Sequence, residues 1–430
     1  ALARYFNLQG KKVFGYDKTP SKITNTLISE GITIQYKDQV SLIPEVIQKN
    51  KNTLIVFTPA IPQNNKILTW LNSKEYNITK RSELLGEISK NSICLAVAGT
   101  HGKTTTSAIL GHLLASCNMP VTAFLGGVTE NYNSNLIYKG SEIMVVEADE
   151  FDRSFLHLKP NIACITSMDA DHLDIYGTTS ELENTFVEFS KLVPDSNNLL
   201  FKKGLPLEGK TVSATENADF EARNVRIEEG SYVFDLKTPS EEIKDLQFHL
   251  PGRHNMFNAV TALGMAILAG SPTDCLSKAL QDFKGVKRRF SYKIRTKNLV
   301  LIDDYAHHPT EINALHQAVT EMYPQNKKLI VFQPHLFSRT KDFGNEFAKS
   351  LSRFDEVMLL EIYPAREEPI EGISSQWLLD KIENGNKEIV TKEELSREVK
   401  KSNCKIKLMV GAGDIGIEVE SVTKYLKDED

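Results

Sequence analysis

Short apolar runs alternate with amphipathic stretches along the whole chain. In the first 90 residues, Lys12–Tyr16 and Thr53–Phe57 predict buried strands. Further strands are predicted where apolar runs of similar length recur: Ile93–Ala98, Glu142–Val146, Ile162–Thr166, Leu299–Ile302, Leu329–Phe332, Val357–Leu360 and Lys407–Val410. Strands that alternate with helices in this way favour parallel sheets. The pattern therefore predicts an α/β protein.

Changes in this rhythm indicate where one domain gives way to the next. Residues 195–250 are polar with short strands, which favours an insertion or a β-rich edge, and a helix is expected from about His254 to Ala269. The basic, glycine-bearing stretch Gly285–Ser291 is typical of a hinge. We predict three domains in series: 1–90 and 291–430, both Rossmann-like, and 91–290, a P-loop ATPase domain with a mostly parallel sheet.

Composition narrows the class of protein. The chain has 430 residues, 41% of them hydrophobic, and a formal net charge of -5, which argues against a dedicated nucleic-acid binder. No apolar run approaches the ~18 residues that a membrane span needs. The five cysteines are scattered, with no CxxC pair. Reduced structural thiols and a cytoplasmic location are therefore predicted.

The sharpest motif, Ala98–Thr106, lies between a predicted strand and a predicted helix. Glycines at a helix start let backbone N–H groups approach an anion. Lys103 can reach the β- and γ-phosphates, and the Thr104 hydroxyl can bind Mg²⁺. Because Val97 stands where the general pattern has its first glycine, a purely structural turn remains an alternative. Nucleotide contacts are predicted for the loop residues Gly99, Thr100, His101, Gly102, Lys103, Thr104 and Thr105.

Two acidic segments, Glu147–Asp152 and Asp169–Asp174, follow the next two predicted strands. In a parallel sheet both would emerge at the carboxyl edge, beside the phosphate loop. Carboxylate oxygens there suit Mg²⁺ held against a γ-phosphate. For Asp152, Asp169 and Asp174, a solvated loop or a helix cap is the alternative.

Three later motifs need separate interpretation. The adjacent histidines of Asp303–Thr310 suggest zinc, but no third ligand lies at suitable spacing. Gly411–Gly416 fits the dinucleotide-binding pattern GxGxxG, but too little chain follows for a second strand with a ribose-binding acid, so a structural role is preferred. Arg339, after a predicted strand, fits a bidentate carboxylate clamp.

Taken together and in this order, these motifs resemble those of the Mur ligases and their relatives. The resemblance rests on segments across most of the chain: Gly99–Thr106, Glu147–Glu150, Ala170–Asp174, Gly252–Ala259, Arg288–Phe290, Asp303–Thr310, Gln333–Thr340 and Tyr363–Ile370. It implies a UDP-sugar-binding first domain, a central ATP-binding domain and an amino-acid-binding last domain. It also implies an ATP-dependent, ADP-forming ligase that joins L-alanine to the carboxylate of UDP-N-acetylmuramate through an acyl phosphate, in peptidoglycan precursor synthesis.

The resemblance further implies roles for single residues. Lys103, Glu147 and His172 are expected to be catalytic, and Thr104, Glu147 and His172 to hold Mg²⁺. Asn255 is expected at the adenine of ATP, Arg289 at a phosphate and Asp304 at the ribose. The residues expected to contact the other substrates are His335, Arg339, His308 and Asp17.

This sequence departs from the family pattern at several points. Leu336 replaces the second arginine of many relatives, so alanine binding should depend more on His335 and Arg339. We hypothesise that Glu188 supplies the carboxylate that a carbamylated lysine gives in several sister ligases. The chain starts within a βα unit, after the place of the family's glycine-rich UDP loop, so residues are expected upstream.

Two other functions remain as alternatives. One is a recycling ligase that attaches a preformed peptide to the same sugar nucleotide, and the other is a P-loop protein whose binding depends on nucleotide. No nucleic-acid or membrane partner is expected, and both a monomer and a dimer are compatible with the sequence.

Overall fold

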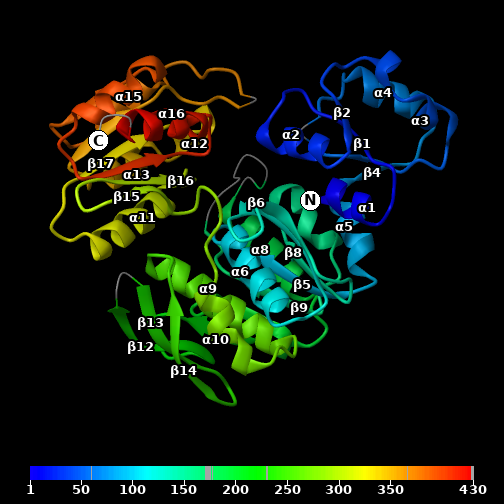
Figure 1. Cartoon of the computed structure of the whole chain (residues 1–430), viewed down its shortest axis with the longest axis horizontal. Helices are drawn as coiled ribbons and strands as arrows, with labels where there is room; N and C mark the ends of the chain where they lie inside the picture. The colour runs from blue at the N-terminus through cyan, green and yellow to red at the C-terminus, as the bar shows by residue number, and fades with distance from the viewer. Residues whose placement is uncertain (60, 170–175, 177, 229–230, 366, 428–430) are drawn as a thin grey trace.

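The computed structural model describes residues 1–59, 61–169, 176, 178–228, 231–365 and 367–427. Figure 1 shows three lobes: a first lobe from α1 to α5 in blue, a central lobe from β5 to α10 in cyan and green, and a last lobe from β15 to α16 in yellow to red. Both outer lobes adjoin the central one. In the described part of the chain, no helix is long and apolar enough to cross a membrane.

The first lobe contains two separate parallel pairs of short strands. Strands β1 (Phe14–Tyr16) and β2 (Thr33–Gln35) form one pair, and β3 (Ile55–Phe57) and β4 (Ile78–Lys80) form the other. The helices around them are α1 (Leu2–Leu8), α2 (Lys22–Ser29), η1 (Val40–Leu42), α3 (Glu45–Lys49), α4 (Lys66–Ser73) and α5 (Arg81–Ser89). Buried Arg4 joins this lobe to the central one, since it pairs with Glu30 and donates to Asn135 Oδ1 at 2.8 Å.

The central lobe is built on a ten-stranded sheet in the order β14-β13-β12-β11-β10-β9-β5-β8-β6-β7. Its six inner pairings, from β12-β11 to β8-β6, are parallel, and the pairings at both edges are antiparallel. The strands are β5 (Ile93–Ala98), β6 (Val121–Thr129), β7 (Ser134–Tyr138), β8 (Ile143–Glu147), β9 (Ile162–Ile165), β10 (Leu199–Lys202), β11 (Lys210–Ser213), β12 (Phe220–Glu228), β13 (Ser231–Lys237) and β14 (Glu242–Phe248). The expectation of a β-rich edge in residues 195–250 is confirmed.

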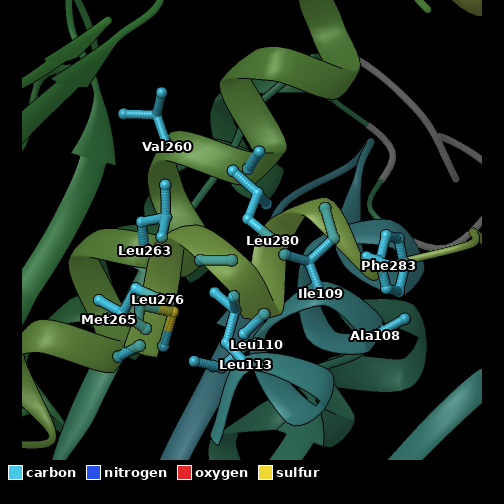
Figure 2. Close-up of a cluster of buried hydrophobic side chains, with 14 of the residues drawn as sticks. Ala108, Ile109, Leu110, Leu113, Val260, Leu263, Met265, Leu276, Leu280 and Phe283 are labelled. Atoms are coloured by element: carbon cyan, nitrogen blue, oxygen red, sulfur yellow. The ribbon is translucent and has the colours of Figure 1, made fainter. Parts of the chain in front are cut away.

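Helix α6 (Lys103–Ser116) is the centre of the largest core. Every residue from Thr105 to Ala115 is buried, as expected for a helix that is apolar on nearly all sides. Figure 2 shows Ile109, Leu110 and Leu113 packed against side chains of α9 (Arg253–Leu268) and α10 (Thr273–Gln281). Burying each such side chain contributes about 1.5–3 kcal/mol, so the helix that carries the phosphate loop is rigidly held.

The last lobe has a six-stranded sheet in the order β15-β16-β20-β17-β18-β19, parallel except at β15. Its strands are β15 (Ser291–Arg295), β16 (Val300–Asp304), β17 (Lys328–Phe332), β18 (Glu356–Leu359), β19 (Lys387–Ile389) and β20 (Ile406–Val410). Its helices are α11 (Pro309–Met322), α12 (Phe337–Asp342), α13 (Gly344–Leu351), α14 (Ser375–Lys381), α15 (Lys392–Lys401) and α16 (Ile415–Lys427). The predicted α/β fold with mostly parallel sheets is thus confirmed.

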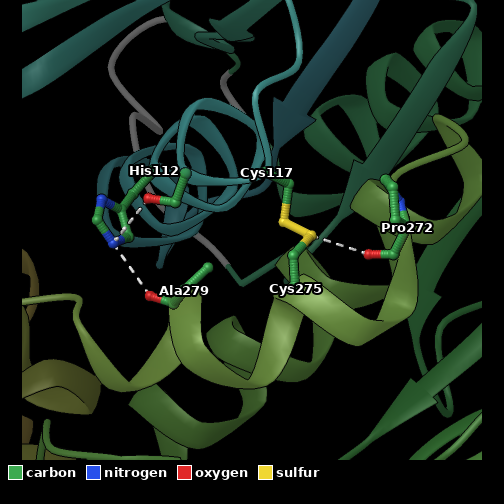
Figure 3. The surroundings of a disulfide bond; sticks show 6 residues. His112, Cys117, Pro272, Cys275 and Ala279 are labelled. Atoms are coloured by element: carbon green, nitrogen blue, oxygen red, sulfur yellow. Dashed lines mark hydrogen bonds between the residues drawn. A yellow bond between two sulfur atoms is a disulfide. The ribbon is translucent and has the colours of Figure 1, made fainter.

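The prediction that all five cysteines are reduced is wrong. Cys117, which ends α6, and Cys275 in α10 form a disulfide with their Cα atoms 5.7 Å apart. Figure 3 shows the bond beside the buried His112. Because 158 residues separate the two cysteines, only the packing of α6 on α10 brings them together. Cys94, Cys164 and Cys404 are free and buried.

Candidate active site

The phosphate loop runs from the end of β5 into α6, and its neighbours leave no room for side chains at its glycines. Gly99 has φ +126° and Gly102 has φ +86°, a region that favours glycine. A Cβ at Gly99 would lie 2.1 Å from Thr166 Oγ1, and one at Gly102 would lie 2.6 Å from Asn258 Oδ1. The two glycines therefore let the loop pack closely against Thr166 and Asn258 at the start of α6, where an anion is favoured.

Lys103 lies at the first position of α6 with its ammonium group turned back over the loop. Its Nζ donates to Gly99 O at 2.7 Å and to both carboxylate oxygens of buried Glu150, at 2.9 and 2.8 Å. Burial alone would lower the pKa of Lys103, but Glu150, Asp149 and Glu147 outweigh it and raise that pKa. The lysine is therefore a fixed positive charge beside the loop.

Glu147, at the end of β8, faces the start of α6. Its Oε2 accepts from the Thr104 hydroxyl at 3.0 Å, and its Oε1 accepts from the Ser107 hydroxyl at 3.2 Å and from the backbone N–H of Gly126. These oxygens are the ligand types that Mg²⁺ prefers. His172, the third predicted ligand, lies outside the described residues. Among the residues described, no group of three or more His, Cys, Asp or Glu side chains could hold a metal.

A cavity of about 340 Å³ lies between the central lobe and the last lobe. The central lobe contributes the phosphate loop, the start of α9 and the ends of β10 and β11, with residues that include His101, Thr105, Asn255, Asn258, Lys202 and Lys203. The last lobe contributes residues that include Asp304, Thr310 and Glu311, and the hinge before it contributes Arg289. We name this space the interlobe cavity. Six residues predicted to contact ATP line it, namely His101, Gly102, Thr105, Asn255, Arg289 and Asp304. The other four predicted contacts, Gly99, Thr100, Lys103 and Thr104, are not among the lining residues.

Asp304 of the last lobe and Arg289 of the hinge form part of the same wall of the cavity. Asp304 accepts the backbone N–H groups of Phe290 at 2.7 Å and Ala306 at 2.8 Å, which fixes the orientation of its carboxylate. Burial raises the pKa of Asp304 to about 6, although Arg289 opposes this effect. The Arg289 guanidinium lies 5.0 Å from the centre of the Tyr305 ring, so the hinge arginine is placed at the cavity by stacking.

The residues predicted to bind the other substrates lie at separate places. Arg339 is buried in α12, with Nη1 3.5 Å from Nδ1 of His335, whose ring stacks on Tyr363. His308 is the N-cap of α11, where its ring nitrogen accepts from the Thr310 N–H at 3.3 Å. Asp17 is exposed at the carboxyl end of β1, in the first lobe.

A second cavity, of about 210 Å³, lies between the first lobe and the central lobe. Glu147 lines it with Asp149, Phe151 and Ser154 of the central lobe, and with Thr58, Arg81 and Ser82 of the first lobe. Glu147 therefore touches both the phosphate loop and a space that the first lobe helps to enclose. Glu188, in contrast, is exposed on α8 (Thr179–Ser190).

Several residues of the site were not predicted to be functional from the sequence. Asn258 follows Asn255 by three positions, so the helical period could have placed both on one face of α9. Glu150 belongs to a recognised motif, but only its contact with Lys103 distinguishes it from the neighbouring acids. Lys202, Lys203 and Glu311 had no local signal, because only the fold brings them to the interlobe cavity.

The chain matches known proteins over its whole length. Residues 1–92 match the model "Mur ligase family, catalytic domain", residues 97–266 match "Mur ligase middle domain", and residues 288–414 match "Mur ligase, glutamate ligase domain". The chain is 60% identical to the UDP-N-acetylmuramate–L-alanine ligase of Christiangramia forsetii, over 100% of this chain and 95% of that protein. It is 59% identical to the ligase of the same name from Flavobacterium psychrophilum, over 100% of this chain and 96% of that protein.

Solved structures agree with these sequence matches. The crystal structure of the UDP-N-acetylmuramate–alanine ligase of Thermotoga maritima superposes with a TM-score of 0.85 at 25% identity, covering 100% of this chain and 96% of that one. A murein peptide ligase from Psychrobacter arcticus shares the fold with a TM-score of 0.69 at 18% identity, again covering 100% and 96% of the two chains. The three matched regions and the full-length identity leave one assignment: the chain belongs to the Mur ligase family.

Proposed function

We propose that this chain joins L-alanine to the carboxylate of UDP-N-acetylmuramate at the expense of ATP, which is a step of peptidoglycan precursor synthesis. The proposal rests above all on the position of Glu147, which contacts Thr104 of the phosphate loop and lines the cavity shared with the first lobe. A phosphate donor on the loop and an acceptor held by the first lobe would meet beside this carboxylate. The full-length relatives named for this reaction support the choice of substrates.

ATP would occupy the interlobe cavity, with its phosphates on the loop. Asn255 and Asn258 offer amide donors and acceptors for a base, and Asp304 offers a carboxylate for ribose hydroxyls. Arg289 and Lys103 bring positive charge toward the phosphates. Because both lobes line this cavity, ATP would bind between them.

Thr104 and Glu147 would hold Mg²⁺, with His172 as a further predicted ligand for a second ion. The hydroxyl and carboxylate oxygens lie 3.0 Å apart, and this donor set fits the preference of the ion. Bound Mg²⁺ would neutralise charge on the β- and γ-phosphates.

The reaction would proceed in two stages. Lys103 and the loop amides stabilise the charge that develops as the γ-phosphoryl group moves to the carboxylate of the sugar nucleotide, which gives an acyl phosphate and ADP. The amine of L-alanine, with its carboxylate held by Arg339 and His335, then attacks the acyl carbon, and inorganic phosphate leaves. Asp17 would contact the UDP group, and His308 would act within the interface between the lobes. We place the reaction in the cytoplasm, where ATP is supplied.

The decisive experiment is an assay of phosphate release from ATP with UDP-N-acetylmuramate and several amino acids in turn, with mass detection of the product. Release that requires both the sugar nucleotide and L-alanine, together with the matching amide, would establish the function. If a tripeptide replaced alanine, the recycling ligase would be correct. ATP turnover without any amide product would favour a nucleotide-dependent binding protein.

A further inference from the structure

A carboxylate of the last lobe reaches across the interface to the phosphate loop. Glu311 lies in the first turn of α11, and its Oε1 is 3.3 Å from Nδ1 of His101 in the loop. Its Oε2 accepts the backbone N–H of His307 at 2.9 Å, within its own lobe. One oxygen thus fixes the carboxylate at the start of α11, and the other contacts the central lobe.

The environment keeps this carboxylate charged. Burial alone would raise the pKa of Glu311, but His307, His101 and Arg289 hold it well below the usual range. The ring of His307 lies 3.3 Å from Oε2. A mostly buried carboxylate with basic groups on two sides is stabilised only while those groups stay in place. Because His101 belongs to the central lobe, the stability of the charged Glu311 side chain depends on the docking of the two lobes.

Ring packing supports the same contact. The rings of His101 and His308 have their centroids 5.1 Å apart, and His308 is buried at the N-cap of α11. The other ring nitrogen of His101 lies 3.6 Å from Asp169 of the central lobe. His101 therefore lies between an acid of its own lobe and an acid of the last lobe.

Helix α11 docks on the central lobe at its far end as well. Glu321 accepts from the Tyr232 hydroxyl at 2.5 Å and pairs with Arg253 Nε at 3.2 Å. Of these two carboxylates on α11, Glu311 itself lines the interlobe cavity, whereas Glu321 does not, although its partner Arg253 does. The helix thus makes two contacts with the central lobe, one through a carboxylate that lines the cavity and one through a carboxylate that does not.

We infer that Glu311 is a positioning residue that acts through His101, so that the phosphate loop takes its ATP-binding arrangement when the last lobe is docked. This inference rests on the proposed function in that ATP is the ligand of the interlobe cavity. The inference assigns Glu311 no contact with the reacting atoms. It couples the docking of α11 to the affinity of the phosphate loop for the nucleotide.

A double-mutant cycle on nucleotide affinity tests the inference without using ligase activity. The affinity of a non-hydrolysable ATP analogue is measured by calorimetry for the wild type, Glu311→Gln, His101→Gln and the double variant. Each single change should weaken binding about tenfold, and the double variant should be no weaker than either, because contacting residues are energetically coupled. A loss in the double variant equal to the product of the single losses, about a hundredfold, would overturn the inference.

Glu321→Gln is the matched control, since it alters an interlobe carboxylate of the same helix that does not itself line the cavity. When Glu321→Gln is combined with His101→Gln, the two losses of nucleotide affinity should multiply. A double variant that binds no more weakly than either single variant would mean that any loosening of the lobes disturbs the loop. That result would overturn the specific role of Glu311. If Glu311→Gln does not fold, Glu311→Asp serves in the same cycle, because it keeps the charge and shortens the reach. The amide assay with the wild-type protein separates the two proposals. Absence of the L-alanine amide product would reject the alanine-adding function, whereas the double-mutant cycle would still test the role of Glu311 in nucleotide binding.

Discussion

The Thr104 hydroxyl lies 3.0 Å from Oε2 of Glu147, and this contact joins the phosphate loop to the cavity that the first lobe helps to enclose. Both residues stand at the carboxyl edge of the central sheet, one after β5 and the other at the end of β8, and these strands pair directly. Donor and acceptor sites for a phosphoryl group are thereby brought to one edge of one sheet.

Replacing Glu147 should weaken the use of Mg²⁺. In Glu147→Gln the shape is kept and the negative charge is lost, so the Mg²⁺ concentration for half-maximal activity should rise at least about tenfold. Titration of activity with Mg²⁺ measures this. Glu142→Gln, at the exposed start of the same strand region, is the control and should leave the titration unchanged. An unaltered titration in Glu147→Gln would remove this residue from the metal site.

Lys103 should be needed for chemistry more than for folding. Lys103→Met removes the fixed positive charge beside the loop, and kcat should fall about 10²- to 10³-fold, as when other preorganised charges are removed. The variant leaves Glu150 without its cation, so thermal unfolding must be followed alongside the rate. A rate within threefold of the wild type would contradict the assigned role.

Arg339 should govern the affinity for the amino acid. A lysine cannot make two parallel hydrogen bonds to a carboxylate, so Arg339→Lys should raise KM for L-alanine about tenfold and change KM for ATP little. Steady-state kinetics with each substrate varied in turn distinguish the two effects. Lys341→Ala, an exposed change on the same helix, is the matched control. Equal rises in both KM values would point to a disturbed fold of α12 instead.

His112 should make the protein less stable in mild acid. Burial lowers its pKa in the folded state, where the ring contacts the Tyr132 hydroxyl and the Ala279 carbonyl at 3.0 Å each. As pH falls below about 6.5, His112 becomes protonated in the unfolded chain but stays neutral in the folded protein. The free energy of unfolding should therefore fall by up to about 1.4 kcal/mol per pH unit from this group.

Denaturant unfolding at pH 8, 6.5 and 5 measures this dependence. His112→Gln should show a shallower loss between pH 6.5 and 5 than the wild type, whatever its stability at pH 8. Parallel curves for the two proteins would show that His112 does not contribute.

The disulfide should be visible in the mass and in the stability. Alkylation of the unfolded, unreduced protein should label three cysteines and not five, because Cys117 and Cys275 are bonded to each other. Reduction should lower the free energy of unfolding by about 2–4 kcal/mol, as for other disulfides that close long loops. Cys275→Ser should show the same loss and no further response to reductant. Labelling of all five would contradict the bond.

Features encoded in neighbouring residues were predictable from the sequence, whereas those created by distant packing were not. The tight turn at Gly99 and Gly102 could be predicted from the sequence, because glycine is favoured in a tight turn at the start of a helix. The contact between Glu311 and His101 was not predictable, because 210 positions separate them and the phosphate-loop motif around His101 does not indicate a partner in the last lobe. The prediction of five reduced cysteines was wrong for a related reason. The spacing of the cysteines indicates no pairing, and only the packing of the helices brings Cys117 to Cys275.

The division of the interlobe cavity between two lobes also bears on any inhibitor aimed at it. A compound that touches Asn255 on one wall and Asp304 on the other must hold both walls in position, so its measured affinity includes the free energy of bringing them together. Such a compound would act as a bridge, and its binding strength would fall by the fraction of molecules whose walls stand apart. A compound confined to the phosphate loop would escape that penalty and would forgo the contacts of the second wall.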